Sequence, residues 1–316
     1  MAQLLVRRVS LAVLQVFLVL TLIFALIHLL PGDPVLMILG AEQSPDPAVV
    51  AAVREKLGLN RPLLTQYVTW IKGIAQLDLG SSLMDGSPVW QTAIERLPRT
   101  LELVLAAVAV ATILGIPLGV LAALHRNRLA DWVVSTLAAM GISTPVYVMG
   151  SLAVLIFAVK LRWLPTAGYV AFAEDPGAHV LRMVLPTAVL ALGLIATITR
   201  TTRSSVLEVL HQDYVRTARA KGVRPQGVIM RHVLRTALIP IVTVIGLQLG
   251  TLIGSSVLVE FIFNWPGIST LLVTAIGRRD YPMVQGVILL TSSLFILINM
   301  VVDVIYGYLD PRIHYS

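Results

Sequence analysis

Six stretches of this chain are apolar, nearly free of charged side chains and long enough to cross a lipid bilayer. A helix needs about 20 apolar residues to span the hydrocarbon core, where no water is present to bind the backbone N–H and C=O groups. Because helices satisfy these groups internally, each stretch is predicted to be a transmembrane helix. The composition agrees, since 57% of the residues are hydrophobic and 13% are charged, which excludes a soluble globular protein. The sequence therefore predicts an all-α, polytopic membrane protein with six transmembrane helices.

The first predicted span covers residues 9–30 and follows Arg7 and Arg8. It continues into Pro31 and shows no small-residue cleavage site, so we interpret it as an uncleaved helix and not as a secretory signal. Residues 1–30 form the first part of the chain, residues 31–100 a polar loop, and residues 101–316 the membrane core. The core holds the other five spans, at residues 101–124, 132–159, 183–199, 236–259 and 281–302.

The third span is interrupted by Gly141, Pro145 and Gly150, so we predict a kink within it. The polar loop before the core contains patterns for three short helices, at residues 47–57, 62–74 and 88–97.

Tyr67 and Trp70 share the apolar face of the second of these short helices. Two functions fit this aromatic face: contact with the membrane surface, or docking of an external binding protein.

The distribution of basic residues predicts which side of the membrane each loop occupies. Six spans place both termini on one side, and the segments on that side hold 13 of the 24 Lys and Arg residues. The two short loops on the other side hold 5, and the long first loop holds 6. Because short cytoplasmic loops are enriched in Lys and Arg, both termini and the loop of residues 200–237 are predicted to be cytoplasmic. The net charge of +7 thus reflects orientation and a protein partner, not binding to nucleic acid.

Residues 213–240 form a strongly basic, helix-prone segment between the fourth and fifth spans. Tyr214, Val215 and Ala218 recur at helical spacing, while the charged side chains point elsewhere. Gly222 supplies a helix stop, and a second helical pattern follows Pro225. We predict two short helices that form a knob, with a small apolar face free to enter a groove of another protein. The alternative is an ordinary basic loop that only fixes orientation.

The sequence DYVRTARAKG at residues 213–222, followed by LIP at residues 238–240, resembles the cytoplasmic loop of permease subunits in binding-protein-dependent ABC importers. The form is that of the dipeptide, oligopeptide, glutathione and nickel branch. The resemblance implies the type I ABC importer transmembrane fold and a coupling helix that docks in a cleft of the ATPase subunit. Where the general motif begins Glu-Ala-Ala, this chain has Arg-Thr-Ala. The residues implied to act in coupling are Asp213, Tyr214, Arg216, Thr217, Ala218, Arg219, Ala220, Lys221 and Gly222.

Other stretches resemble the same branch, including LPGDP after the first span, residues 57–82 and the terminal DPRI. Residues 263–286, FNWPGISTLLVTAIGRRDYPMVQG, match its pattern as well and predict a short helix at residues 268–276. The resemblance implies that Arg278, Arg279 and Asp280 contact the binding protein. A turn held by prolines, without a docking function, is the alternative.

The fifth span carries Gly246, Gly250 and Gly254, a ridge that lets another helix approach closely. A polar stripe beside it must face protein or water, because hydrocarbon offers no hydrogen-bond partner. We predict that polar residues of the fifth and sixth spans line a translocation path, although packing within the subunit would also explain them. The candidate path residues are Gln248, Thr251, Ser255, Ser292 and Asn299.

Asp303 lies near the inner end of the sixth span. An acid inside a membrane is a functional candidate, but we predict a structural pair with Arg200 or Arg203.

Several motifs are absent from the sequence. There is no GxxxxGK[ST], so ATP and Mg²⁺ are expected on partner subunits, and no cofactor is expected on this chain. There is no HExxH or GxSxG, no cysteine, and no ligand spacing among the six histidines, so neither a metal site nor a membrane enzyme is predicted.

The resemblance implies a non-catalytic permease in the inner membrane, surrounded by lipid. Its implied partners are a second permease in a heterodimer, two ATPase subunits and an extracytoplasmic substrate-binding protein. Di- and oligopeptides are the expected cargo by family, with glutathione and nickel left open. A secondary transporter or channel working alone would need no ATP and would give the basic loop no purpose.

Overall fold

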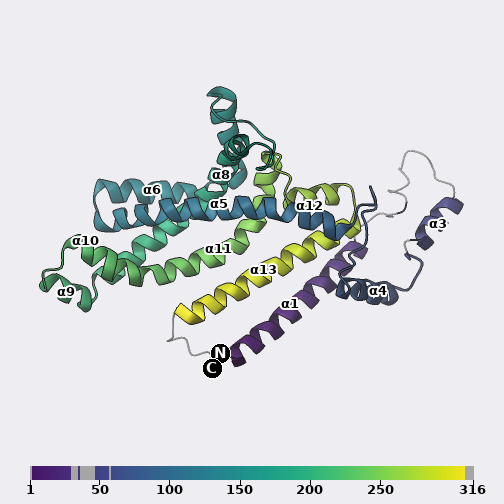
Figure 1. Cartoon of the computed structure of the whole chain (residues 1–316), viewed down its shortest axis with the longest axis horizontal. Coiled ribbons are helices and arrows are strands. Elements are labelled where there is room, and N and C mark those ends of the chain that lie inside the picture. Colours follow the sequence, from purple (N-terminus) through teal and green to yellow (C-terminus); the bar gives the residue numbers. More distant parts are fainter. Residues whose placement is uncertain (1, 30–34, 36–46, 57, 310–316) are drawn as a thin grey trace. The chain divides into compact units, whose positions relative to one another are not determined.

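A computed structural model describes residues 2–29, 35, 47–56 and 58–309 (Figure 1). Within these residues the regular structure is helical, and the only β-type pairing is an isolated bridge between Ser81 and Pro88. Five of the described helices are long and apolar enough to cross a membrane, or six if a bent pair of helices is counted as one span. The predicted all-α membrane fold is therefore confirmed. The long helices are α1 (Ala2–Leu29), α5 (Val89–Leu124), α8 (Pro176–Leu210), α11 (Leu234–Ile262) and α13 (Tyr281–Leu309).

The bent pair consists of α6 (Leu129–Ser143) and α7 (Val146–Ala153), with α7 continued by a π-helical segment, η1 (Val154–Lys160). The two halves meet at 104°, and the break falls at Pro145. Proline lacks the N–H that an uninterrupted helix would use, and its ring disfavours helical backbone in the residue before it. The predicted kink in the third span is thus a full break.

The chain divides into two compact units. The first comprises residues 1–98 and 267–296, and the second comprises residues 99–266 and 297–316. Helices α5 and α13 are each divided between the two units, after Pro98 and after Ile296. The interior of each unit is described separately.

The first unit contains α1, the short helices α3 (Pro47–Lys56) and α4 (Leu63–Ala75), and α12 (Ile268–Gly277), together with the starts of α5 and α13. Its core gathers apolar side chains from segments far apart in the sequence: Leu20, Leu79, Val89, Ala93, Ile268, Ala275, Met283, Val284, Val287 and Leu289. The loop of residues 31–100 and the segment before the last span therefore share one core.

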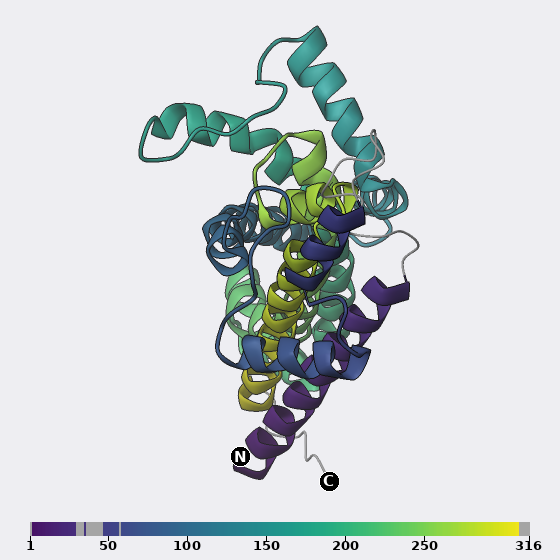
Figure 2. The same ribbon diagram turned by 90° about the vertical axis from the view of Figure 1, so that its right-hand side faces the viewer.

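The second unit is built around α8, which packs against α6, α7 and α11. Helix α5 approaches α8 closely at Gly115 and Gly119, since a Cβ atom at Gly119 would lie 2.5 Å from Cβ of Thr202. This G-x-x-x-G spacing permits close packing of membrane helices, and the sequence analysis missed it. Figure 2 shows α7 with η1 and the first turns of α8 as two arms joined by the loop of residues 161–175.

Several helices extend beyond their predicted bounds, α5 and α8 among them. The predicted short helix at residues 88–97 and the second span form one continuous helix, α5, which runs through Pro98. The fourth span is also longer than its apolar core, since α8 begins at Pro176 and ends at Leu210. Asp175 caps the start of α8 by accepting a hydrogen bond from the backbone N–H of Ala178 at 3.0 Å. Polar turns thus extend the helix beyond the apolar stretch that sequence periodicity detects.

Candidate functional site

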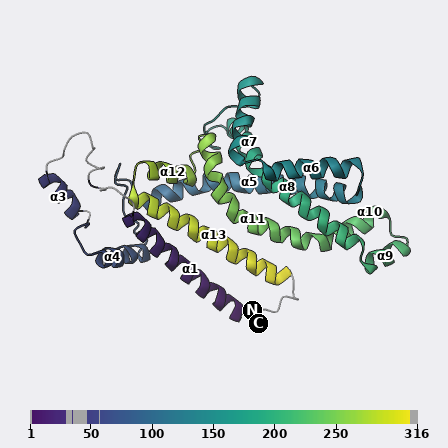
Figure 3. The same cartoon turned by 180° about the vertical axis from the view of Figure 1, so that it is seen from behind.

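The basic segment between α8 and α11 folds into two short helices and a π-helical turn. These are α9 (Asp213–Ala220), α10 (Pro225–Gly227) and η2 (Val228–Val233). We call residues 213–233 the knob. Figures 1 and 3 both show it where α8 ends and α11 begins. The first predicted short helix is confirmed as α9, but the second is not a separate helix, because α10 and η2 continue into α11 as one helix from Pro225 to Ile262.

Gly222 ends α9 in a Schellman motif. Its backbone N–H donates to the carbonyl of Arg219 at 3.0 Å, and the N–H of Val223 donates to the carbonyl of Ala218 at 3.3 Å. Gly222 has φ +77°, a left-handed conformation that costs other residues free energy, while a Cβ atom there would meet nothing within 4 Å. Glycine is therefore needed for its backbone freedom and not for space, and the predicted helix stop is confirmed.

The apolar side of α9 faces the chain's own helices. Val215 is fully buried and Ala218 is 7% exposed, both in an apolar cluster that includes Ala123 at the end of α5. We call this the knob cluster, and its members are Ala123, Val206, Val209, Val215, Ala218, Val228, Val233 and Ala237. The expectation that this small apolar face is free for a partner is wrong for Val215 and Ala218, because the ends of α5, α8 and α11 already cover them.

The opposite side of the knob is exposed and strongly basic. Tyr214 is 44% exposed, and its hydroxyl donates to Oγ1 of Thr236 on α11 at 3.2 Å. Asp213 and Arg216 form an exposed ion pair at 3.7 Å, which is too screened to fix the loop strongly. The remaining predicted coupling residues on this side are all exposed: Thr217, Arg219, Ala220 and Lys221, with Gly222 at the helix end. A partner for this surface would have to offer acidic or hydrogen-bond-accepting groups.

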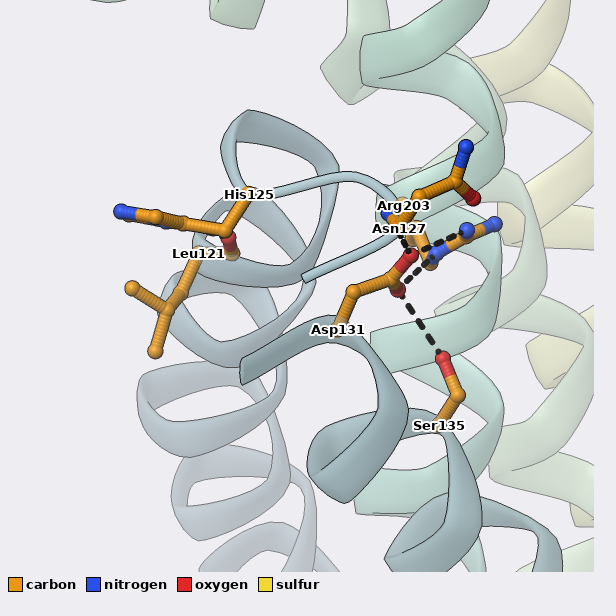
Figure 4. Close-up of polar contacts among 6 residues, drawn as sticks. All are labelled: Leu121, His125, Asn127, Asp131, Ser135 and Arg203. Atoms are coloured by element: carbon orange, nitrogen blue, oxygen red, sulfur yellow. Dashed lines mark hydrogen bonds and ion pairs between the residues drawn. The ribbon is translucent and has the colours of Figure 1, made fainter. Parts of the chain in front are cut away.

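An ion pair with a buried carboxylate joins α6 to the part of α8 that precedes the knob. Asp131, in the first turn of α6, is 5% exposed and accepts hydrogen bonds from Nε and Nη2 of Arg203 at 2.6 and 2.8 Å. Its carboxylate also accepts from the backbone N–H of Asn127 at 3.0 Å and from the hydroxyl of Ser135 at 3.2 Å (Figure 4). The sequence analysis assigned Arg200 or Arg203 to Asp303, whose side chain lies outside the described residues. Arg203 instead holds Asp131.

The predicted path residues on α11 make local hydrogen bonds. The hydroxyl of Thr251 donates to the carbonyl of Gln248 at 2.9 Å, and that of Ser255 donates to the carbonyl of Leu252 at 3.1 Å. Thr251 is exposed, and Gln248 and Ser255 are half-buried. In α13, Ser292 and Asn299 are half-buried as well, but they belong to different units. Whether these residues line a path stays a prediction.

The three glycines of the α11 ridge differ in how closely other residues pack against them. A Cβ atom at Gly246 would lie 2.5 Å from Val302 of α13, so this end of the ridge allows close packing within the chain. Gly250 is buried, whereas Gly254 is exposed and faces no atom within 4 Å.

The predicted docking residues for a binding protein lie in the first unit. Tyr67 and Trp70 of α4 pack on Phe24 of α1, with ring centroids 5.2 and 5.8 Å apart. Arg278 and Arg279 are exposed. Tyr67 and Trp70 are half-buried, so the two arginines are the more exposed residues, and docking at these four residues stays a prediction.

Asp280 is 4% exposed and therefore does not offer a docking surface. Its carboxylate accepts from the hydroxyl of Ser82 at 2.5 Å and from the backbone N–H of Leu83 at 3.1 Å. The backbone N–H of Met283 adds a third bond at 3.4 Å, so Asp280 caps α13. The expectation of binding-protein contact is wrong for this residue, because the sequence Asp-Tyr-Pro here marks a helix start.

Two further polar contacts, each with at least one buried member, join helices of the second unit, and sequence reasoning did not predict either. His179 of α8 is 2.7 Å from Glu102 of α5 through Nε2, and its Nδ1–H donates to the carbonyl of Val170 at 2.7 Å. Thr100 donates to the buried Glu260 of α11 at 2.5 Å. These contacts hold helices together, and no group of three or more His, Cys, Asp or Glu side chains suited to a metal occurs among the described residues.

Comparisons with known proteins agree over the whole chain. A family model described as "Binding-protein-dependent transport system inner membrane component" matches residues 115–315, and its N-terminal counterpart matches residues 1–104. The chain is 43% identical to the di/tripeptide transport system permease protein DppB of Pseudomonas aeruginosa (strain UCBPP-PA14), covering 98% of each. It is 44% identical to the glutathione transport system permease protein GsiC of Salmonella choleraesuis (strain SC-B67), covering 93% of each.

Among solved structures, a chain of the MetNI methionine ABC transporter, solved in inward-facing conformations, has a similar fold. The TM-score is 0.57 at 20% sequence identity, covering 70% of this chain and 97% of that one.

Proposed function

Because the chain belongs to the family of binding-protein-dependent transport system inner membrane components, we propose that it is the permease subunit of an ATP-driven importer of di- and oligopeptides. In this proposal the chain crosses the inner membrane six times with both termini in the cytoplasm. It forms part of the translocation path and catalyses no reaction itself. The knob docks on an ATPase subunit and passes the movement of that subunit to the membrane helices.

The observation that carries this proposal is the construction of the knob. Its apolar side is anchored on the ends of α5, α8 and α11, while its other side presents exposed basic residues. A segment that is fixed to three membrane helices and also exposed to water is suited to transmit a displacement. An ordinary orienting loop would need the charges but not the anchored cluster.

The proposed complex contains a second permease, two ATPase subunits and an external substrate-binding protein. The partner ATPases hold ATP and Mg²⁺, since this chain has no phosphate-binding loop motif. The lack of such a motif makes ATP-dependent function a property of the assembled complex.

Peptides are the proposed cargo because a di/tripeptide permease is similar over nearly the full length of this chain. Glutathione is the second candidate, favoured by the comparable identity to a glutathione permease. Glutathione is itself a tripeptide, so one path lined by hydrogen-bonding side chains would suit both.

The test is ATP hydrolysis by the reconstituted complex, measured with its binding protein and titrated with dipeptides, oligopeptides, glutathione and nickel in parallel. We expect peptides to stimulate hydrolysis and to accumulate inside the vesicles. Stimulation by glutathione or nickel alone would reassign the cargo. If substrate moves without any ATPase subunit, the chain works as a secondary transporter or channel and the proposal fails.

A second test addresses the knob. Arg219→Glu reverses one exposed charge on the docking side, and we expect weaker retention of the ATPase subunit on purified permease. The matched control is Arg54→Glu, which changes a basic residue in the predicted extracytoplasmic loop. Ala218→Arg is unsuitable for this test, because it would bury a charge in the knob cluster and disrupt the loop itself.

A further inference from the structure

The bidentate contact between Asp131 and Arg203 fixes one helix start to another helix in position and in direction. A guanidinium paired edge-on with a carboxylate restrains rotation as well as distance, unlike an apolar contact. Two more donors, the N–H of Asn127 and the hydroxyl of Ser135, occupy the rest of the carboxylate. Each oxygen of the Asp131 carboxylate therefore accepts two hydrogen bonds.

The pair joins α8 to α6, the helices of the second unit that would have to move together with the knob. Arg203 lies on α8, about two helical turns before the end of that helix at Leu210. Asp131 lies on α6, and through Asn127 it also holds the turn between α5 and α6. Figure 4 shows Asp131 between that turn and α8.

The neighbouring contacts are of a different kind. Val206 and Val209 follow Arg203 on α8, nearer the knob. They pack in the knob cluster with Val215 and Ala218. Farther along, α6 and α8 meet through small side chains, and a Cβ atom at Gly141 would lie 3.2 Å from Ala196. Contacts between small apolar side chains have little directionality, so helices can shift along one another there. The ion pair is the directional contact between α6 and α8 at this end.

Helix α6 is also the inner half of a broken span. Its far end is the break at Pro145, where the chain turns by 104°. A helix with a break at one end can tilt when the other end is moved. Whatever moves the start of α6 therefore changes the shape of this span.

We propose that the Asp131–Arg203 pair is the joint that passes movement of the knob from α8 to α6, and so to the broken span. This inference rests on the proposed function, because the knob moves only if an ATPase subunit drives it. Asp131 and Arg203 are positioning residues in this account and have no contact with cargo or nucleotide.

The test compares ATP hydrolysed with peptide transported in the complete complex, reconstituted with its binding protein. Arg203→Lys keeps the positive charge but loses the planar guanidinium that pairs bidentately with the carboxylate. Asp131→Asn keeps the shape of the side chain but loses its negative charge. We expect both complexes to assemble in normal amounts and to hydrolyse ATP, while transport per ATP falls by about fivefold. The double exchange Asp131→Arg with Arg203→Asp should recover part of this loss.

Arg200→Lys is the matched control, since Arg200 lies one turn away on α8 and is exposed. It should leave transport per ATP unchanged. If Arg203→Lys and Asp131→Asn lower only the yield or melting temperature of the complex, with normal transport per ATP, the pair is a structural staple and the inference is wrong.

Should both single variants fail to assemble, the neutral double variant Asp131→Asn with Arg203→Gln decides between the two accounts. Normal transport per ATP in that variant would refute the joint, and a loss would support it. If the unaltered complex shows no dependence of transport on ATP, the proposed function itself fails, and that result is visible before any variant is made.

Discussion

Two buried aspartates, Asp131 and Asp280, perform similar tasks by different means. Each lies at the start of a helix and ties it to a distant segment, α8 in one case and the loop around Ser82 in the other. Asp280 is held by neutral donors, a hydroxyl and backbone N–H groups, and it caps α13. Asp131 is held chiefly by a guanidinium.

The difference predicts how the stability of each site responds when one of its partners is removed. Neutral donors are individually weak, so the site around Asp280 should lose stability in steps as they are removed. A buried charge pair behaves otherwise, because removing one partner leaves an uncompensated charge, whereas removing both can be nearly neutral. Four variants test this contrast.

The largest effect is expected for Arg203→Leu. It leaves the buried carboxylate of Asp131 without its cation, and the free energy of unfolding should fall by about 3 kcal/mol. The thermal melt of the detergent-solubilised protein measures this loss. Arg200→Leu is the control on the same helix, and an equal shift in both variants would show that the ion pair has no special weight.

Asp280→Ala should cost less, about 2 kcal/mol, because it removes a helix cap and strands the hydroxyl of Ser82 and two N–H groups near a surface loop. The same melt gives the value. A loss larger than that of Arg203→Leu would reverse the comparison between the two aspartates.

Ser82→Ala removes one neutral donor from Asp280 and leaves the other two in place. We expect a loss of about 1 kcal/mol, since the bond to Asp280 contributes on that order. The hydroxyl of Ser82 also accepts from the backbone N–H groups of Met84 and Asp85, but these residues are exposed and water can replace those bonds. Ser81→Ala, at the exposed neighbouring residue, is the control. A loss as large as that of Asp280→Ala would mean that the cap acts as one unit and not in steps.

The smallest effect is expected for Asp131→Leu combined with Arg203→Met. Replacing both charges by apolar groups of similar volume should change stability by less than about 1 kcal/mol, despite the cost of the single variant. A melt close to that of Arg203→Leu alone would show that the other bonds of Asp131 are the stabilising ones.

The elements of this fold could be predicted from local patterns. Long apolar stretches predict the membrane helices, and Pro145 and Gly222 predict the places where helices break or stop. These features depend on residues close together in the sequence. Proline alone does not predict a break, since Pro98 and Pro117 lie inside α5, Pro186 inside α8 and Pro240 inside α11.

Which sides of the helices meet could not be predicted in the same way. Asp131 and Arg203 are 72 residues apart, and periodicity alone does not say which helix covers α6. For the same reason Val215 and Ala218 were expected to face a partner, although they face the chain's own helices. Two signals were present but missed: the Gly115–Gly119 spacing and the capping sequence that begins at Asp280.

The exposed side of the knob is the surface proposed to meet an ATPase subunit. The chain has no cysteine, so a single cysteine at Ala220, which is exposed on α9, gives a unique cross-linking site. Cross-linking with a short thiol- and amine-reactive reagent in membranes that hold all the subunits should yield one product that contains the permease and the ATPase. A cysteine at the exposed Thr274 on α12, which is expected at the outer surface, should yield none. If the cysteine at Ala220 reacts with a maleimide probe but never joins an ATPase subunit, the knob is not the docking site and the account is contradicted.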